Sequence, residues 1–178
     1  MGEKCRVGSN VNIFGNIQAF RWINVGGNFG GGPLIYYDEV DPFQGRDRRF
    51  GFFTTIQPNQ HLTQSFNFNR VRFWRPETGI DVYSVNILNS RTTYQFDKHF
   101  LARFLAQYDS SRERVLTDFL ASYEFVPGTV FHVGYGSLYE KGFGSVEPLP
   151  GTSPIDSNDR FLMTNRGLFI KASYLRRF

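Results

Sequence analysis

The sequence predicts an all-β fold, an antiparallel transmembrane β-barrel of about eight up-and-down strands. Apolar and polar residues alternate along most of the chain, and no segment shows a helical period. In the second half, one of the two alternating faces carries no charged residue. Turn signals such as Pro58-Asn59 and Pro127-Gly128 separate the alternating segments, as expected for strands joined by hairpins.

The composition fits a single β-barrel domain, or a fragment of a barrel, over residues 1–178. Aromatic residues make up 17% of the chain, yet its mean hydropathy is only -0.35. No run approaches the roughly 20 consecutive apolar residues that a membrane helix needs. A transmembrane barrel does not need such a run, because only alternate residues of each strand face lipid.

The first candidate strand covers about residues 11–24. The apolar residues change from one set of alternate positions to the other within it, which predicts a bulge. A glycine-rich segment follows from Gly26 to Pro33, and residues 26–47 are predicted to form a long outer loop. A phosphate-cradling loop is the functional alternative for these glycines. It would need a strand-to-helix context and a following Gly-Lys-Ser/Thr, and neither is present. We therefore expect a flexible loop.

The middle of the chain predicts a hairpin and one long strand. Residues 50–56 alternate up to Pro58-Asn59, and residues 62–68 alternate on the return. After the turn signal at residues 76–79, a strand is expected over about 80–96, with a slip of parity in its middle.

Three further hairpin strands and a terminal strand fill the second half, separated by a long outer loop over residues 141–162. The charge-free face comprises Phe100, Ala102, Phe104, Ala106, Tyr108, Thr117, Phe119, Ala121, Tyr123, Phe125, Phe131, Val133, Tyr135 and Tyr139. The opposite face carries Arg103, Asp118, Glu124, His132 and Lys171. Short turns at one end and longer connections at the other are typical of membrane barrels, so we expect the charge-free face to meet lipid.

Charge and cysteine content exclude several other classes. The net charge is +4, but the basic residues form no continuous stripe, so no nucleic-acid partner is expected. The basic run from Arg70 to Arg75 is interpreted as an interfacial anchor that faces anionic lipid headgroups. Cys5 is the only cysteine, which excludes an intrachain disulfide. Because residues 1–6 show no signal peptide, we expect the chain to be the tail of a longer precursor.

The terminal strand, which ends at Phe178, resembles the last strand of bacterial outer-membrane barrels. In those proteins the terminal Phe is part of the signal that the barrel assembly machinery reads. The resemblance implies this machinery and outer-membrane lipid as partners, and the cell outer membrane as location.

The second half also resembles the carboxy-terminal barrel of an uncharacterised bacterial family of large outer-membrane proteins. The resemblance rests on Tyr94-Gln95-Phe96, Ser122-Tyr123, Pro127-Gly128-Thr129-Val130, Gly134-Tyr135-Gly136 and the run from Arg166 to Tyr174. Full-length members carry an amino-terminal domain similar to carbohydrate-binding modules, followed by a barrel of more strands. The resemblance implies that this chain is the carboxy-terminal part of a larger barrel, with amino-terminal strands or a domain missing. No residue here matches the carbohydrate-binding domain, so no sugar site is carried over.

Catalysis would have to use His61, His99 or His132. A short turn at residues 127–129 predicts that His132 lies opposite Glu124, as a base with its orienting carboxylate or as two polar groups that satisfy each other. Because no nucleophile other than Ser122 stands nearby, we prefer the second interpretation. The protein is predicted not to be an enzyme, and no catalytic, cofactor-binding or metal site and no cofactor are expected.

The function predicted from these patterns is an outer-membrane β-barrel segment with an anchoring or conduit role. The alternative is a soluble lipocalin-like barrel that binds an apolar ligand among Phe104, Phe119 and Val133. The two hypotheses differ in which face of the sheet points inward.

Register arithmetic in the second half yields one sharp prediction. A three-residue turn at residues 97–99 places Thr93 beside Arg103. A four-residue connection at residues 109–112 places Phe104 opposite Thr117, and Arg103 opposite Asp118 on the inner face. Arg103 is therefore expected to lie between Thr93 and Asp118.

Overall fold

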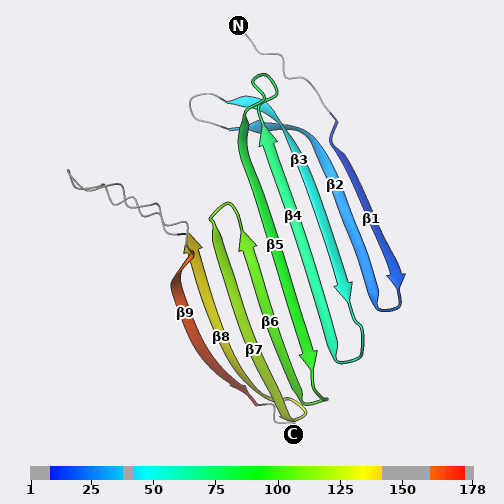
Figure 1. Cartoon of the computed structure of the whole chain (residues 1–178), viewed down its shortest axis with the longest axis vertical. Coiled ribbons are helices and arrows are strands. Elements are labelled where there is room, and N and C mark those ends of the chain that lie inside the picture. The colour runs from blue at the N-terminus through cyan, green and yellow to red at the C-terminus, as the bar shows by residue number, and fades with distance from the viewer. Residues whose placement is uncertain (1–8, 38–41, 142–160, 175–178) are drawn as a thin grey trace, which may run out of the picture.

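The computed structural model describes residues 9–37, 42–141 and 161–174. These residues form one antiparallel sheet of nine strands, in which every strand pairs with its neighbours in sequence (Figure 1). The strands are β1 (Val11–Phe20), β2 (Ile23–Tyr36), β3 (Phe43–Ile56), β4 (Leu62–Trp74), β5 (Asp81–Gln95), β6 (Phe100–Asp109), β7 (Arg114–Val126), β8 (Thr129–Lys141) and β9 (Phe161–Ser173). None of the described residues belongs to a helix that could cross a membrane.

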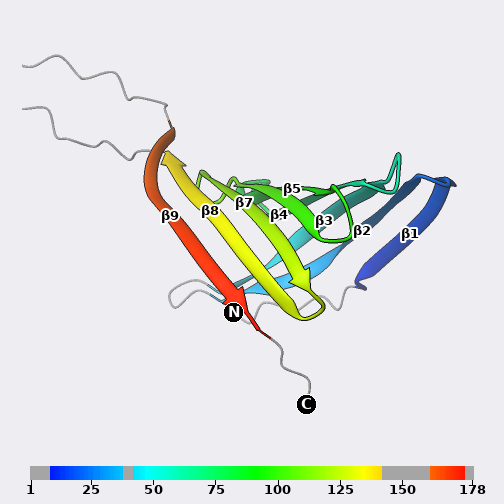
Figure 2. The same ribbon diagram turned by 90° about the horizontal axis from the view of Figure 1, so that it is seen from below.

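The predicted all-β, antiparallel, up-and-down architecture is confirmed, but the described residues form nine strands rather than about eight. The sheet is also open. Within the described residues, β1 pairs only with β2 and β9 only with β8, and Figure 2 shows these two edge strands far apart on a strongly curved, twisted sheet.

The long outer loop expected over residues 26–47 is wrong, because most of it is strand. The glycine-rich segment lies in β2, which pairs with β3 from Ile23 to Tyr36 without a break. Gly26 makes room for a ring, because a Cβ there would lie 2.2 Å from the Phe53 ring. The second predicted loop, residues 141–162, lies outside the described residues except for its ends, which belong to β8 and β9.

Burial distinguishes the two faces of the sheet, since residues paired across an antiparallel sheet share a face. Among the described residues, the buried ones lie on one face, with Ser137 as the exception: Gly26, Gly30, Gly45, Asp47, Gly51, Phe73, Asp109 and Gly134. Side chains converge on the concave side of a curved sheet, so we call this the inner face and the opposite one the outer face.

The prediction of which residues face inward is confirmed in the second half. Arg103 and Asp118 lie on the inner face, and Phe104, Phe119 and Val133 lie on the outer face. The soluble alternative needs those last three residues inside the barrel, so their position on the outer face counts against it.

The register prediction is right at one hairpin and wrong at the next. Thr93 pairs with Arg103, as predicted. Across β6 and β7, however, Arg103 pairs with Leu120 and Phe104 with Phe119, a slip of two residues from the expected register. The connection uses residues 110–113 instead of 109–112, with Glu113 at a positive φ of 45°. A slip of two preserves the face, so Asp118 lies diagonal to Arg103 instead of opposite it.

Candidate functional site

An aromatic cluster on the inner face is the best-packed part of the described sheet. The cluster consists of Tyr36, Phe43, Phe73 and Tyr83, from β2, β3, β4 and β5. The ring centroid of Phe73 lies 5.9 Å from Tyr36, 6.0 Å from Phe43 and 5.4 Å from Tyr83. Phe73 has no exposed surface, unlike every other large apolar side chain in the described residues.

A glycine makes this packing possible. A Cβ on Gly45 would lie 2.2 Å from the tip of the Phe73 ring and 3.0 Å from the Trp74 carbonyl oxygen, so no larger residue fits there. Arg75 closes the cluster from the loop end, with its guanidinium carbon 3.9 Å from the centroid of the Phe43 ring. The result is a rigid apolar surface with a cation at its border, on the inner side of the sheet.

Polar groups surround the cluster and continue along the inner face. Next to Phe73, Asp47 forms an ion pair with Arg49, with a 2.7 Å distance between Nε and Oδ2, and accepts a hydrogen bond from the Gly32 amide at 3.1 Å. Further along, the Asp118 carboxylate lies against Gly136, where an added Cβ would be 2.5 Å from its Oδ1. Both carboxylates lie on the inner face, and a polar interior is typical of membrane barrels.

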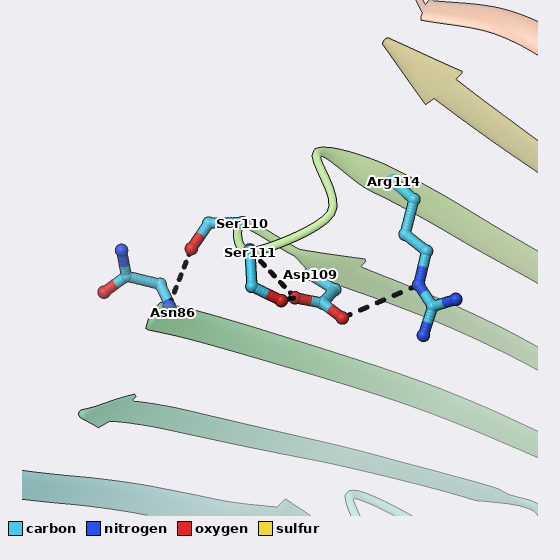
Figure 3. Close-up of polar contacts among 5 residues, drawn as sticks. All are labelled: Asn86, Asp109, Ser110, Ser111 and Arg114. Atoms are coloured by element: carbon cyan, nitrogen blue, oxygen red, sulfur yellow. Dashed lines mark hydrogen bonds and ion pairs between the residues drawn. The ribbon is translucent and has the colours of Figure 1, made fainter. Parts of the chain in front are cut away.

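The connection between β6 and β7 is organised by Asp109, which is almost completely buried (Figure 3). Its Oδ1 accepts hydrogen bonds from the Ser111 amide at 2.9 Å and the Ser111 hydroxyl at 2.6 Å. Its Oδ2 lies 3.5 Å from Nε of Arg114. Ser110 ties the turn to β5, since its hydroxyl accepts a 2.7 Å hydrogen bond from the Asn86 amide. The Asp109 carboxylate and the Ser110 hydroxyl together therefore link β5, β6 and β7 at this end.

We expect Asp109→Ala to lower the free energy of unfolding by about 1.5–3 kcal/mol, because hydrogen bonds to a buried charge are lost. Urea titration of the protein in detergent micelles would measure the loss. Asp97→Ala is the matched control, because Asp97 caps the β5–β6 turn through the His99 and Phe100 amides but is fully exposed. An equal or larger effect of Asp97→Ala would contradict this role of Asp109.

The same two amides lower the pKa of Asp97 below its ordinary value of 3.8, with the His99 amide contributing most. The two amides therefore stabilise the ionised form of Asp97, which is the form that caps the turn.

His132 does not have the partner that the sequence predicts for it. His132 pairs with Ser122 and not with Glu124, and its Nδ1 lies 2.8 Å from the Ser122 hydroxyl. Glu124 instead accepts a 3.1 Å hydrogen bond from the Gly128 amide within the turn. A serine nucleophile needs a histidine that a third group orients, and no carboxylate is bonded to this histidine among the described residues. The predicted partner was wrong for two reasons: the turn has two residues instead of three, and a register shift between Glu124 and Val126 moves the pairing by one more.

The other two histidines lie at the same end of the sheet as His132, in different turns. His61 contacts the Gln95 carbonyl oxygen through Nδ1 at 2.7 Å, and the His99 ring lies 6.4 Å from that of Tyr123. In the described part of the chain, no group of three His, Cys, Asp or Glu residues could hold a metal ion.

Comparison with known proteins adds little to this geometry. No protein family and no curated protein matches the sequence. Among solved structures, the CymD monoaromatic hydrocarbon channel is similar, with a TM-score of 0.42 and 14% identity over 75% of this chain and 46% of that chain. The chain thus spans less than half the length of that channel. A likeness this weak transfers no function.

Sequence reasoning missed the aromatic cluster, because Tyr36 and Phe43 fell in the segment interpreted as a loop. The sequence offers no clear periodic signal for it, because residues 46–49 are charged at both parities.

Proposed function

We propose that the chain forms part of the wall of an outer-membrane β-barrel, with an anchoring or conduit role and no catalysis, in the cell outer membrane. The observation that carries the proposal is the outer face, whose large apolar side chains are exposed on the convex side of the sheet. In the central part of the sheet they are Phe50, Phe52, Phe66, Leu88, Tyr94, Phe104, Tyr108, Phe119, Tyr123, Phe131 and Tyr135. A continuous apolar surface of this kind is unstable in water and is what lipid requires.

Several polar side chains on the outer face are hydrogen-bonded, which supports this orientation. Gln64 donates a 3.0 Å hydrogen bond to the Ser90 hydroxyl and accepts one from Thr92. The Thr54 hydroxyl donates to the Asn24 carbonyl oxygen at 2.9 Å. Paired polar groups cost far less in hydrocarbon than unpaired ones, so this face can meet lipid despite its uncharged polar residues.

The edges of the sheet support a larger assembly. All ten residues of β1 are exposed, and so are all but one of β9. Open strand edges cannot lie in lipid, because their amide and carbonyl groups would have no hydrogen-bond partner. We therefore propose that other strands, from the same precursor or from another chain, pair with β1 and β9 and close the barrel.

Fractionation of cells that express the chain tests the proposal. We expect the protein in the outer-membrane fraction, extracted by detergent but not by high salt or carbonate. On gels the unheated sample should migrate differently from the boiled one, since barrel structure resists dodecyl sulfate. A stable soluble monomer without detergent would rule the proposal out. Ion conductance in planar bilayers distinguishes the two roles, because a conduit conducts ions and an anchor does not.

A further inference from the structure

A cluster of arginines lies on the outer face, at the end of the sheet that carries the connections after β2 and β4. This arginine patch consists of Arg46 and Arg48 on β3 and Arg70 and Arg72 on β4, and all four side chains are exposed. The ring of Trp74 lies within the patch, with its centroid 5.6 Å from the guanidinium carbons of both Arg48 and Arg72. Arginine has no place on a lipid-facing surface at the bilayer centre, so the patch marks a headgroup level.

The charge of the patch is not balanced by the described protein. Arg72 forms an ion pair with Asp81 at 2.8 Å. Among the described residues, no carboxylate pairs with Arg46, Arg48 or Arg70. Arg48 and Arg72 also lie directly opposite each other across the two strands, an arrangement that is unfavourable for like charges. A bound anion beside Arg48 would relieve this repulsion.

An open hollow of about 1190 Å³ adjoins the patch on the outer face. Arg46, Arg48 and Trp74 line it, together with apolar side chains that include Phe29 and Ile35. Arg75 and Glu77, from the connection after β4, also line the hollow and add no net charge. Asp47 lines it as well, and its charge is paired with Arg49. The hollow is therefore cationic at one side and apolar at the other.

A second hollow of about 560 Å³ continues along the outer face from Phe29, which lines both. Its lining is almost wholly apolar and includes Ile13, Ile17, Val25 and Phe52. Gly15 and Gly27 also line it, and the absence of side chains there deepens the hollow. From Val11 in the first hollow to Ile17 in the second, β1 advances roughly 20 Å along the sheet. A ligand that fits both hollows has an anionic end and a long apolar chain.

We propose that the arginine patch and the two hollows form a binding site for one phosphate-bearing lipid of the surrounding membrane leaflet. The phosphate lies among Arg46, Arg48 and Arg70, whose planar guanidinium groups match phosphate oxygens. One acyl chain follows the apolar hollow along β1 and β2. The continuity of the cationic and apolar parts favours a lipid over free phosphate. This proposal rests on the proposed membrane location and assigns a specific site within it.

Fluorescence quenching by brominated lipids tests the site, because Trp74 lies inside it. The chain has two tryptophans, so Trp22→Phe leaves Trp74 as the only reporter and keeps an aromatic ring beside Phe20. In vesicles, we expect brominated phosphatidylglycerol to quench Trp74 at concentrations at least about fivefold lower than brominated phosphatidylcholine does. A factor of about five is the contribution of one basic residue to binding at an anionic surface. Combining Arg46→Gln, Arg48→Gln and Arg70→Gln in this background should abolish the preference.

Arg166→Gln is the matched control, since Arg166 lies on the outer face of β9, away from the patch, and its loss should leave the preference unchanged. Equal quenching by the two lipids would overturn the lipid site but keep the membrane location. Quenching by neither lipid would instead contradict the proposed function. If millimolar inorganic phosphate abolished the stronger quenching by brominated phosphatidylglycerol, the patch would be a site for free anions, and the proposal would also be overturned.

Discussion

Replacing Phe73 by alanine is expected to lower the free energy of unfolding by about 3–5 kcal/mol, the usual cost of removing a fully buried phenylalanine. Phe73 has 0% exposure and packs against three rings from three other strands. Removing it leaves an enclosed cavity, because those rings are held by their own strands. The loss would be measured by urea titration in detergent micelles, with tryptophan fluorescence as the signal.

Phe104→Ala is the control for this prediction. Phe104 is 43% exposed on the outer face, so its removal opens no enclosed cavity. We expect a clearly smaller loss, with an unchanged dependence of the unfolding free energy on urea concentration. Equal losses for the two variants would mean that the aromatic cluster is not the core of this sheet.

A second large effect is expected from one arginine placed at either of two neighbouring positions in β6. Phe104→Arg puts the charge on the outer face near the middle of the strand, where it should cost about 2–4 kcal/mol in a bilayer. Leu105→Arg puts it on the inner face between Arg91 and Asp118, which pair with Leu105 on either side. There the new charge lies beside one residue of each sign, so a much smaller loss is expected.

The free energies of unfolding in lipid vesicles would rank the two variants. Both place an arginine in β6, so the strand propensity of arginine cancels in the difference between them. The reverse order, with Leu105→Arg the more damaging, would show that the concave face meets lipid. Similar losses in vesicles and in lipid-free buffer would argue against any contact with a membrane.

The facing of the strands was predictable from sequence because it depends on local alternation. In β6 and β7 one of the two alternating faces carries no charged residue, and a parity rule needs no knowledge of the partner strand. The glycines of β2 were misread because the reason for them is not local. Gly26 in β2 and Gly45 in β3 are small on account of Phe53 and Phe73, and in both cases the ring comes from the next strand along the chain.

Register was harder to predict than facing. The β6–β7 pairing depends on which residue of the connection adopts a positive φ. That residue is Glu113, and glutamate rarely adopts this backbone conformation. The carboxylate of Asp109 accepts a hydrogen bond from Ser111, and Asp109 is the last residue of β6. The connection therefore covers residues 110–113 instead of the predicted 109–112. Similarly, a register shift before Val126 gives His132 a serine instead of a glutamate as its partner.

The strictly sequential order of the strands has a consequence for how this sheet forms and grows. The main contacts of each strand are with the strand before it and the strand after it, so almost every interaction is completed within one hairpin. Each new hairpin closes only a short loop and so loses little conformational entropy, and the sheet can assemble by adding hairpins one after another. Its stability is then close to a sum over neighbouring interfaces, as in repeat proteins. Hairpins could accordingly be gained or lost at β1 or β9 without disturbing the interior, a route by which barrels of different circumference can arise from one sheet.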